Sequence, residues 1–208
     1  AKENGDIVQY DRELDFAEER FAPIFAAYAK QPIETLAQDP EALKVGQRLF
    51  SQNCSQCHGS DARGQRGFPN LTDNDWLYGG TPAKITETLT LGRQAAMPAQ
   101  LDSFGEKGIE EVVAYALSGR QVDPDLAEKG KVRFAICSAC HGPDGKGNQA
   151  IGAPNLTDNI WLYGGSHKAV TETLTYGRNG VMPSFKKTLG DEKIHLVAAY
   201  VYSLSQGK

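Results

Sequence analysis

A five-residue cysteine motif occurs twice in this chain, and its two copies contain all four cysteines. The copies are Cys54-Ser55-Gln56-Cys57-His58 and Cys137-Ser138-Ala139-Cys140-His141. Each lies in a longer repeated segment: residues 70–74 return at 155–159, residues 76–80 return at 161–165, and Met97-Pro98 returns as Met182-Pro183. Two copies of a unit that each carry their own site can each close their own core. The repeat therefore predicts two similar small domains.

The motif Cys-x-x-Cys-His is the attachment sequence of c-type haem. Two thiols at this spacing can form thioethers to the vinyl groups of one porphyrin, and the next residue places an imidazole under the iron. We therefore predict two covalently bound haem c groups. The thioether residues are Cys54, Cys57, Cys137 and Cys140, and the axial histidines are His58 and His141.

Two disulfides or one zinc site are the alternatives for four cysteines. Zinc ribbons separate their cysteine pairs by about 15–20 residues, whereas His58 and His141 are 83 residues apart. A thioredoxin-like cysteine pair lies between a strand and a helix, and it gives no reason for a histidine directly after the pair in both copies. Haem is the interpretation that accounts for both histidines.

The distal iron ligand decides between electron transfer and catalysis, because an open sixth position binds oxygen, peroxide or carbon monoxide. The chain has only two methionines, and Met97 and Met182 occupy the same repeat position. We predict that both ligate iron, with each repeat keeping its own methionine. Methionine ligation closes the iron and raises its potential. The competing candidates, His167 and His195, have no histidine at the equivalent repeat position, which favours surface roles.

Three further repeated pairs are candidates for contacts around the haem. A ligating histidine usually donates its other N–H to a carbonyl, and an indole N–H or a guanidinium suits a propionate. The candidates are Pro69 and Pro154 for the carbonyl, Trp76 and Trp161 at the haem edge, and Arg93 and Arg178 for propionates or a docking partner. Turn formation, core packing and solvated charge, respectively, remain open as alternatives.

The spacing of apolar residues predicts an all-α chain. In each repeat one helix leads into the cysteine motif, a second follows Pro82 or Ser166, and a third closes the domain. The first helices span 41–53 and 125–137, and the closing helices span 109–117 and 191–204. We expect an N-terminal helical extension at 1–40, domain 1 at 41–119 and domain 2 at 124–208. In the extension, apolar residues between positions 14 and 28 have amphipathic helical spacing.

Charge and hydropathy exclude several classes of protein. The formal net charge is −4, and nothing resembles the basic footprint of a nucleic-acid-binding protein. No apolar run approaches the roughly 18 residues of a membrane span. Covalent haem attachment takes place outside the bacterial cytoplasm, so we expect this soluble fragment on the periplasmic side of the inner membrane.

A helix ending in Cys-x-x-Cys-His, a loop proline, a Met-Pro and a closing aromatic-bearing helix resemble the class I cytochrome c fold, once in each half. More specifically, the chain resembles the diheme subunit, subunit III or CcoP-type, of cbb3-type cytochrome c oxidase. The segments that carry this resemblance are Pro23-Ile24-Phe25-Ala26-Ala27-Tyr28, Gln47-Arg48-Leu49-Phe50, Cys57-His58-Gly59-Ser60-Asp61-Ala62-Arg63-Gly64, Gly67-Phe68-Pro69-Asn70-Leu71-Thr72-Asp73 and Gly92-Arg93-Gln94-Ala95-Ala96-Met97-Pro98.

The resemblance implies two tandem cytochrome c domains that pass electrons and catalyse nothing on their own. The donor would be a soluble or membrane-anchored cytochrome c, and the other partners would be the remaining subunits of a proton-pumping terminal oxidase. It also implies a membrane anchor in the full-length protein. A free diheme shuttle and a diheme peroxidase are the alternative functions, and the matching methionines argue against the peroxidase.

Overall fold

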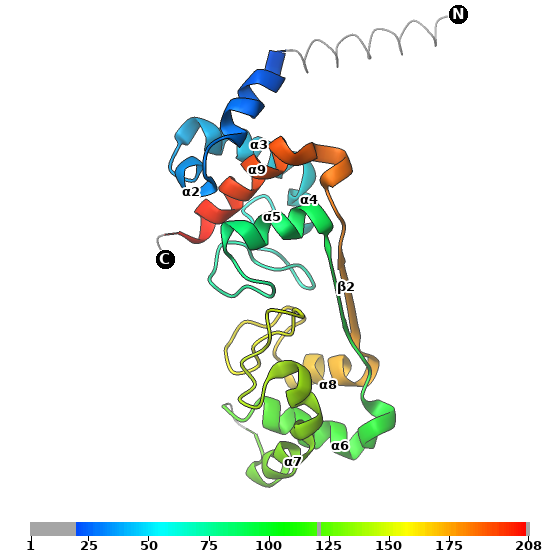
Figure 1. The fold of residues 1–208 in the computed structure, drawn as a ribbon. Coiled ribbons are helices and arrows are strands. Elements are labelled where there is room, and N and C mark those ends of the chain that lie inside the picture. Colours follow the sequence, from blue (N-terminus) through cyan, green and yellow to red (C-terminus); the bar gives the residue numbers. More distant parts are fainter. Residues whose placement is uncertain (1–19, 120–121, 207–208) are drawn as a thin grey trace, which may run out of the picture.

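The structure is a computed structural model that describes residues 20–119 and 122–206 (Figure 1). Residues 20–29 are helical, and the other helices are α2 (Ile33–Leu36), α3 (Pro40–Asn53), α4 (Ser55–His58), α5 (Pro82–Leu91), α6 (Leu101–Ala116), α7 (Pro124–His141), α8 (His167–Tyr176) and α9 (Lys186–Ser205). Two short strands, β1 (Arg93–Met97) and β2 (Arg178–Met182), complete the elements. The predicted all-α fold class is confirmed, with this one two-stranded ribbon added.

Helices α3 and α7 begin in the same way because both repeats place Asp-Pro at this point. The Asp39 carboxylate accepts hydrogen bonds from the first backbone N–H groups of α3, and Asp123 does the same for α7. The proline that follows each cap has the fixed φ of a first helical residue and needs no N–H partner there. From these N-termini, α3 runs to the first cysteine motif and α7 runs through the second.

The ribbon of β1 and β2 is the feature that the sequence did not predict. The strands are antiparallel, with Arg93 opposite Met182 and Met97 opposite Arg178. Each follows a glycine with positive φ, Gly92 at 74° and Gly177 at 72°, which ends the preceding helix and turns the chain outward. Figure 1 shows the two strands running side by side along the molecule, from one group of helices to the other.

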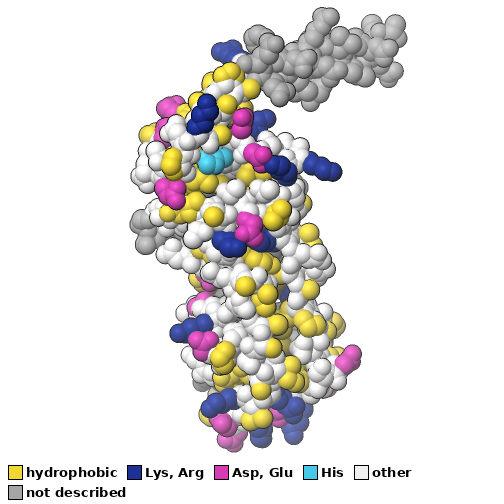
Figure 2. All heavy atoms as spheres, in the orientation of Figure 1, with side chains coloured by type: hydrophobic (Ala, Val, Ile, Leu, Met, Phe, Trp, Pro, Cys, Tyr) yellow, Lys and Arg dark blue, Asp and Glu magenta, His cyan; other side chains and the backbone are white. Residues whose placement is uncertain are grey.

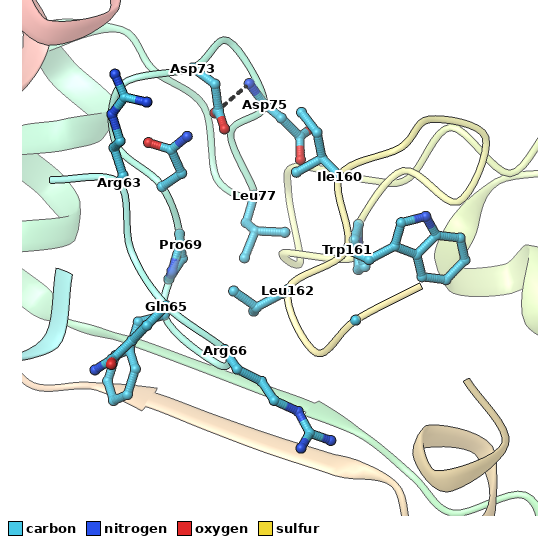
Figure 3. A pocket seen from close by; sticks show the side chains of 14 residues that line it. Arg63, Gln65, Arg66, Pro69, Asp73, Asp75, Leu77, Ile160, Trp161 and Leu162 are labelled. Carbon is cyan, nitrogen blue, oxygen red and sulfur yellow. Dashed lines mark hydrogen bonds between the residues drawn. The ribbon is translucent and has the colours of Figure 1, made fainter. Parts of the chain in front are cut away.

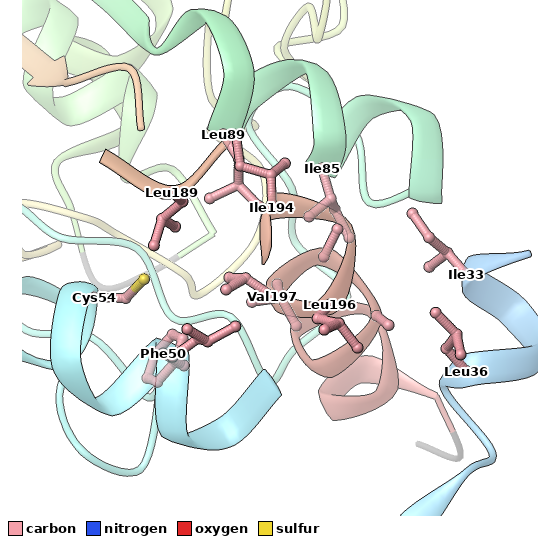
Figure 4. Close-up of a cluster of buried hydrophobic side chains, with 14 of the residues drawn as sticks. Ile33, Leu36, Phe50, Cys54, Ile85, Leu89, Leu189, Ile194, Leu196 and Val197 are labelled. Atoms are coloured by element: carbon pink, nitrogen blue, oxygen red, sulfur yellow. The ribbon is translucent and has the colours of Figure 1, made fainter. Parts of the chain in front are cut away.

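The helices form two units, and each unit combines parts of both repeats. In the first unit α9 packs against α2, α3 and α5, and in the second unit α6 packs against α7 and α8. Figure 4 shows Phe50 and Cys54 meeting Leu196 and Val197 of α9 in the core of the first unit. In the second unit the core is formed mainly by α6 and α8. The closing helices are therefore exchanged between the repeats.

Because of this exchange, the expected domains do not coincide with the two packed units. The ranges 41–119 and 124–208 describe the repeats of the sequence, but the closing helix of each range packs in the unit of the other. The physical reason is the ribbon: five extended residues carry the chain roughly 13 Å, so the helix that follows begins beyond the unit it has left. The repeated sequence makes this possible, because both closing helices present equivalent side chains.

The expected N-terminal extension is described only from residue 20. Phe25 and Tyr28 pack against the core of the first unit, and Ile33 and Leu36 are buried in it. The part of the expected helix before residue 20 lies outside the described residues. The described part of the extension therefore belongs to the first unit.

The surface is mixed in charge. On the face seen in Figure 2, lysine and arginine side chains lie among aspartate and glutamate side chains, and no single basic patch stands out. None of the helices in the described part of the chain is both long enough and apolar enough to span a bilayer.

Two helix crossings depend on glycine. A Cβ at Gly46 would lie 2.8 Å from the Tyr200 Cβ, and a Cβ at Gly130 would lie 2.8 Å from the Tyr115 Cβ. One turn further along, Phe50 packs on Tyr200 with ring centroids 5.5 Å apart, and Phe134 packs on Tyr115 at 5.1 Å. Each first helix thus crosses the closing helix of its unit at a glycine.

We expect Gly46→Ala to lower the free energy of unfolding of the haem-loaded protein by about 1–3 kcal/mol, because overpacking against α9 outweighs the helix propensity that alanine adds. Gly130→Ala should behave alike. Chemical denaturation followed by circular dichroism measures the change. Gly119→Ala is the matched control, since a Cβ there meets no atom of the described residues within 4 Å. Equal stability of Gly46→Ala and Gly119→Ala would contradict the close crossing.

Candidate haem-binding sites

The two cysteine motifs lie in different units, each at the end of a helix. Cys54 precedes α4 in the first unit, while Cys137 and Cys140 lie in the last turns of α7 in the second. All four cysteines are free, with Cys57 and Cys140 exposed and Cys54 buried. Burial raises the pKa of the Cys54 thiol to about 11 and also raises the pKa of Cys137. Each motif thus offers one outer and one inner thiol.

The alternatives to haem do not match this placement. Among the described residues, no three His, Cys, Asp or Glu side chains converge on a possible ion position. The four thiols are unpaired and divided between two units, so they form neither the disulfides nor the four-cysteine zinc site considered from the sequence.

Both motif histidines are buried and held in the same way. The Nδ1 of His58 lies 3.0 Å from the Pro69 carbonyl oxygen, and the Nδ1 of His141 lies 3.0 Å from the Pro154 carbonyl oxygen. A carbonyl only accepts hydrogen bonds, so Nδ1 is the donor and Nε2 keeps its lone pair. Burial lowers the pKa of His58, against the opposing effect of this hydrogen bond. A neutral imidazole with a free Nε2 is the form that ligates iron.

The two methionines lie in the opposite units from those expected. Met182, at the end of β2, packs against the core that contains Cys54. Met97, at the end of β1, packs against the core of the second unit, as does Cys137. Each methionine therefore packs in the unit that holds the cysteine motif of the other repeat, whereas the sequence analysis expects each repeat to keep its own methionine.

Arg93 and Arg178 are held in matching pockets beside the ribbon. Arg93 donates from Nε to Thr88 Oγ1 at 2.9 Å and from Nη1 to Glu87 Oε1 at 2.8 Å. Its guanidinium also stacks on the Tyr78 ring, 4.6 Å from the centroid. Arg178 makes the same contacts, at 3.0 Å to Thr173, 3.0 Å to Glu172 and 4.6 Å to the Tyr163 centroid.

One nitrogen of each arginine has no partner among the described residues. The Nη2 atoms of Arg93 and Arg178 are buried and make no hydrogen bond. An unsatisfied buried donor on a charged group is costly, and a pair of them at equivalent positions indicates an anionic group that completes each site. The carboxylate of a haem propionate has the required negative charge and acceptor oxygens.

The acidic partners of these arginines, and the tyrosines beneath them, were missed by the sequence analysis. Hydrogen bonds from Lys84 and Arg93 lower the pKa of Glu87, and hydrogen bonding to Arg178 lowers the pKa of Glu172. Both glutamates and both tyrosines recur at the same offset of 85 residues as the arginines. Treating every repeated polar or aromatic residue as a candidate would have found them.

Trp76 and Trp161 pack against the cores of the first and second units, respectively. The Trp161 Nε1 donates to the Asp158 carbonyl at 3.1 Å. The structure thus supports packing for both tryptophans and assigns a backbone contact to the second.

His167 and His195 are removed from both sites. His167 is exposed and lies 3.2 Å from Glu110, while His195 Nε2 lies 2.7 Å from the Gln31 carbonyl oxygen. The exposed placement of His167 agrees with the surface interpretation, whereas His195 is half-buried against the N-terminal extension.

The loops that follow the two motifs meet between the units. The Gly67 N–H donates to the Leu162 carbonyl at 2.8 Å, and Arg66 bonds to Glu172 at 3.2 Å. From the other side, Gln149 donates to the Trp76 carbonyl at 2.9 Å. Figure 1 shows these loops facing one another across the middle of the molecule.

A cavity of about 390 Å³ lies where these loops meet. Figure 3 shows Pro69 and Leu77 on one side of it and Trp161 and Leu162 on the other. Pro154 lines it as well. The carbonyl partners of both motif histidines therefore border the same space, and the two candidate haem sites are neighbours.

The residues present fit haem c in each unit. Two free thiols at the attachment spacing adjoin a buried histidine with a free Nε2, a methionine packs in the same unit, and a buried arginine offers an unpaired donor. The second unit has the same set.

A family model described as cytochrome c oxidase, cbb3-type, subunit III matches residues 41–115 and again residues 125–201. The chain belongs to this family. The double match coincides with the two repeats, and each half contains one complete Cys-x-x-Cys-His motif and one Met-Pro.

Several curated proteins are similar to this subunit III chain. A cbb3-type cytochrome c oxidase subunit CcoP from Rubrivivax gelatinosus is 48% identical over 201 residues, which cover 95% of this chain and 66% of that protein. The subunit CcoP of Cereibacter sphaeroides is 43% identical and covers 91% of this chain and 73% of that protein. The subunit FixP of Bradyrhizobium diazoefficiens is 41% identical, with 88% and 69% covered. The chain thus spans about two thirds of the length of these relatives.

Proposed function

We propose that this chain is the electron-transfer part of a cbb3-type oxidase, with two haem c groups attached at Cys54 and Cys57 and at Cys137 and Cys140. It takes electrons from a soluble or membrane-anchored cytochrome c and passes them toward the oxygen-reducing subunit. It catalyses no oxygen chemistry itself. Family membership and the CcoP and FixP relatives support this function.

The observation that carries the proposal is the common cavity of the two sites. Haem c, when bound, supplies an iron that accepts and releases one electron. His58 and His141 hold the metal side of each site, and their carbonyl partners Pro69 and Pro154 border one cavity. Adjacent sites favour passage of an electron between them. Met97 and Met182 would hold the other side of each iron and so exclude small ligands.

The chain's own residues also set the electrostatics of each site. The Pro69 and Pro154 carbonyls fix the histidine rings and increase their basicity. Arg93 and Arg178 each keep one buried, unpaired N–H group that would bind a propionate carboxylate, and the stacked tyrosines hold the guanidinium planes in place. A positive charge beside haem favours the reduced state, so both arginines raise the reduction potential.

We expect Arg93→Gln to lower one midpoint potential by ~40 mV. The arginine would stabilise the reduced haem over the oxidised haem by about 1 kcal/mol, and for one electron 1.4 kcal/mol corresponds to about 59 mV. Arg178→Gln should lower the other potential. Spectroelectrochemical titration measures both. Lys44→Gln is the control, because Lys44 is 70% exposed, pairs with Glu41 and lies outside the cavity lining. Equal shifts in all three variants would contradict a specific role for the buried arginines.

The location that we propose is the periplasmic side of the inner membrane, where haem is attached covalently. The partners that we propose are the other oxidase subunits and the donor cytochrome. We expect the full-length protein, tagged in the bacterium that encodes it, to copurify with a haem–copper oxidase. Its deletion should slow oxidation of reduced cytochrome c by membranes. Purification of the tagged protein alone, with oxidation unchanged by deletion, would support a free shuttle instead.

A further inference from the structure

We propose that Arg66, a residue of the first unit, is a positioning residue of the second haem site, where it holds Arg178 through a shared glutamate. Its positive charge raises the reduction potential of the haem attached at Cys137 and Cys140. This rests on the proposed function, since it takes a haem at each cysteine motif as its starting point. The potential of one haem would then depend on a side chain that the other unit supplies.

Arg66 reaches from the loop after the first cysteine motif into the second unit. Its Nε donates to the Tyr163 carbonyl oxygen at 3.2 Å, and its Nη2 lies 3.3 Å from Oε1 and 3.2 Å from Oε2 of Glu172. Oε1 of the same glutamate also accepts from Nη1 of Arg178 at 3.0 Å. One carboxylate is therefore shared between a guanidinium of the first unit and the guanidinium of the second site.

The same loop also contacts the tyrosine on which Arg178 stacks. The Gly67 N–H donates to the Leu162 carbonyl at 2.8 Å, and a Cβ at Gly67 would lie 3.5 Å from Cε1 of Tyr163. The Arg178 guanidinium lies over this ring, 4.6 Å from its centroid. Two consecutive residues of the first unit thus support both groups that hold Arg178, the Glu172 carboxylate and the Tyr163 ring.

The first unit neutralises its equivalent glutamate in a different way. Besides the arginine of its own site, Glu87 pairs with Lys84, three residues earlier on α5, at 2.8 Å. The position of Lys84 in the second repeat, 85 residues later, is Ala169, so α8 has no lysine at that point. Arg66 supplies the second cation to Glu172 instead.

The reverse contact between the units is neutral. Arg66 lies eight residues after the first motif histidine, and the residue eight positions after His141 is Gln149. Gln149 donates to the Trp76 carbonyl at 2.9 Å and so crosses between the units in the opposite direction. Of these two equivalent side chains, only Arg66 carries a charge. The second site therefore receives a cation from its neighbour, whereas the first receives an amide.

The charges give the direction of the effect. Hydrogen bonds from Arg178 and, to a smaller extent, from Arg66 lower the pKa of Glu172, so this carboxylate is ionised at neutral pH. Without Arg66, Glu172 would be neutralised by Arg178 alone, and less positive charge would remain beside the haem. Since reduction adds an electron, the loss of this charge disfavours the reduced state. An exposed ion pair contributes little to folding, and the Arg66 side chain is 62% exposed. The potential is therefore the property that we expect to change.

A redox titration of the intact holoprotein tests the proposal. Arg66→Gln should lower the potential that Arg178→Gln lowers and leave the other in place. We expect the equilibrium constant for reduction to fall roughly threefold, or ~28 mV at about 59 mV per tenfold. Arg66→Lys, which keeps the charge, should restore most of the loss. Gln149→Ala is the matched control, because it removes a contact between the units without removing a charge, and it should move neither potential by a comparable amount.

A Glu172→Gln background separates positioning from the effect of charge alone. There Arg66→Gln should change the potential by less than half as much, because the shared carboxylate is gone. An equal shift in both backgrounds, an equal shift from Gln149→Ala, a shift of the potential that Arg93→Gln lowers, or no shift would overturn the role of Arg66 and leave the proposed function intact. Fewer than two covalent haems by the pyridine haemochrome assay of the wild-type protein would contradict both.

Discussion

Replacing Met182 by histidine should lower one of the two midpoint potentials by on the order of 100 mV or more and leave the other nearly in place. A thioether favours ferrous iron, whereas a second imidazole stabilises ferric iron. Axial ligands span about 0.8 V in haem proteins, so a change of this size is well within their range. Spectroelectrochemical titration of the purified holoprotein gives both potentials in one experiment.

Substitutions at other positions of the two strands serve as controls for this result. Met97→His should lower the potential that Met182→His leaves in place. Val181→His places the same side chain one residue away, where the native valine is 64% exposed, and should move neither potential by a comparable amount. If Met182→His and Met97→His both leave the two potentials unchanged, the methionines are not ligands and the proposed sites are wrong.

Replacing Cys54 and Cys57 by alanine should reduce the covalent haem content from two per chain to one. Thioether bonds form only at these thiols in the first unit, and no other cysteine lies within it. The pyridine haemochrome assay, combined with intact-protein mass spectrometry, measures the ratio. The matched variant, with alanine at Cys137 and Cys140, should give the same ratio.

Loss of the first haem should also lower the thermal stability of the first unit. Cys54 belongs to the core of this unit and Met182 packs against it. Without the porphyrin, part of this apolar surface has no packing partner. We expect a fall in the melting temperature that added free haem does not restore. A ratio that stays at two after Cys54 and Cys57 are replaced would contradict the attachment sites.

The helices could be predicted from the sequence because their signals are local. Asp-Pro before α3 and α7, and glycine after α5 and α8, mark helix ends with residues whose preferences arise within one turn. Apolar spacing then indicates the buried face of each helix. The first and closing helices were therefore found within a few residues of their observed bounds, although α6 begins earlier than expected.

The exchange of the closing helices could not be predicted, because the repeat makes both pairings equivalent. Gly46 accepts Tyr200 in the structure, but Tyr115 occupies the same position in the other repeat and offers the same ring. The deciding element is the ribbon, and its strands carry alanine and glycine residues with little preference for extended structure. Strand pairing between segments 85 residues apart leaves no signal in either segment alone.

The parts of the candidate site that could be predicted are those in which a residue pattern serves one known chemical purpose. The cysteine motifs and their histidines were found from spacing alone, and the prolines were found because a ligating imidazole needs a carbonyl. The arginine pockets were only half predicted, since a sequence does not indicate which threonine, glutamate or tyrosine will surround a guanidinium. The unit in which each methionine packs depends on tertiary structure, because the ribbon places it beside the cysteine motif of the other repeat.

The central claim, two closed and neighbouring haem sites that carry electrons, is tested most directly by one redox titration of the wild-type holoprotein with combined optical and electron paramagnetic resonance detection. The account predicts two one-electron steps, both at positive or mildly negative potentials typical of histidine–methionine ligation, and two low-spin ferric signals. Neither reduced haem should bind carbon monoxide. A single step, or a high-spin haem that binds carbon monoxide on reduction, would contradict it.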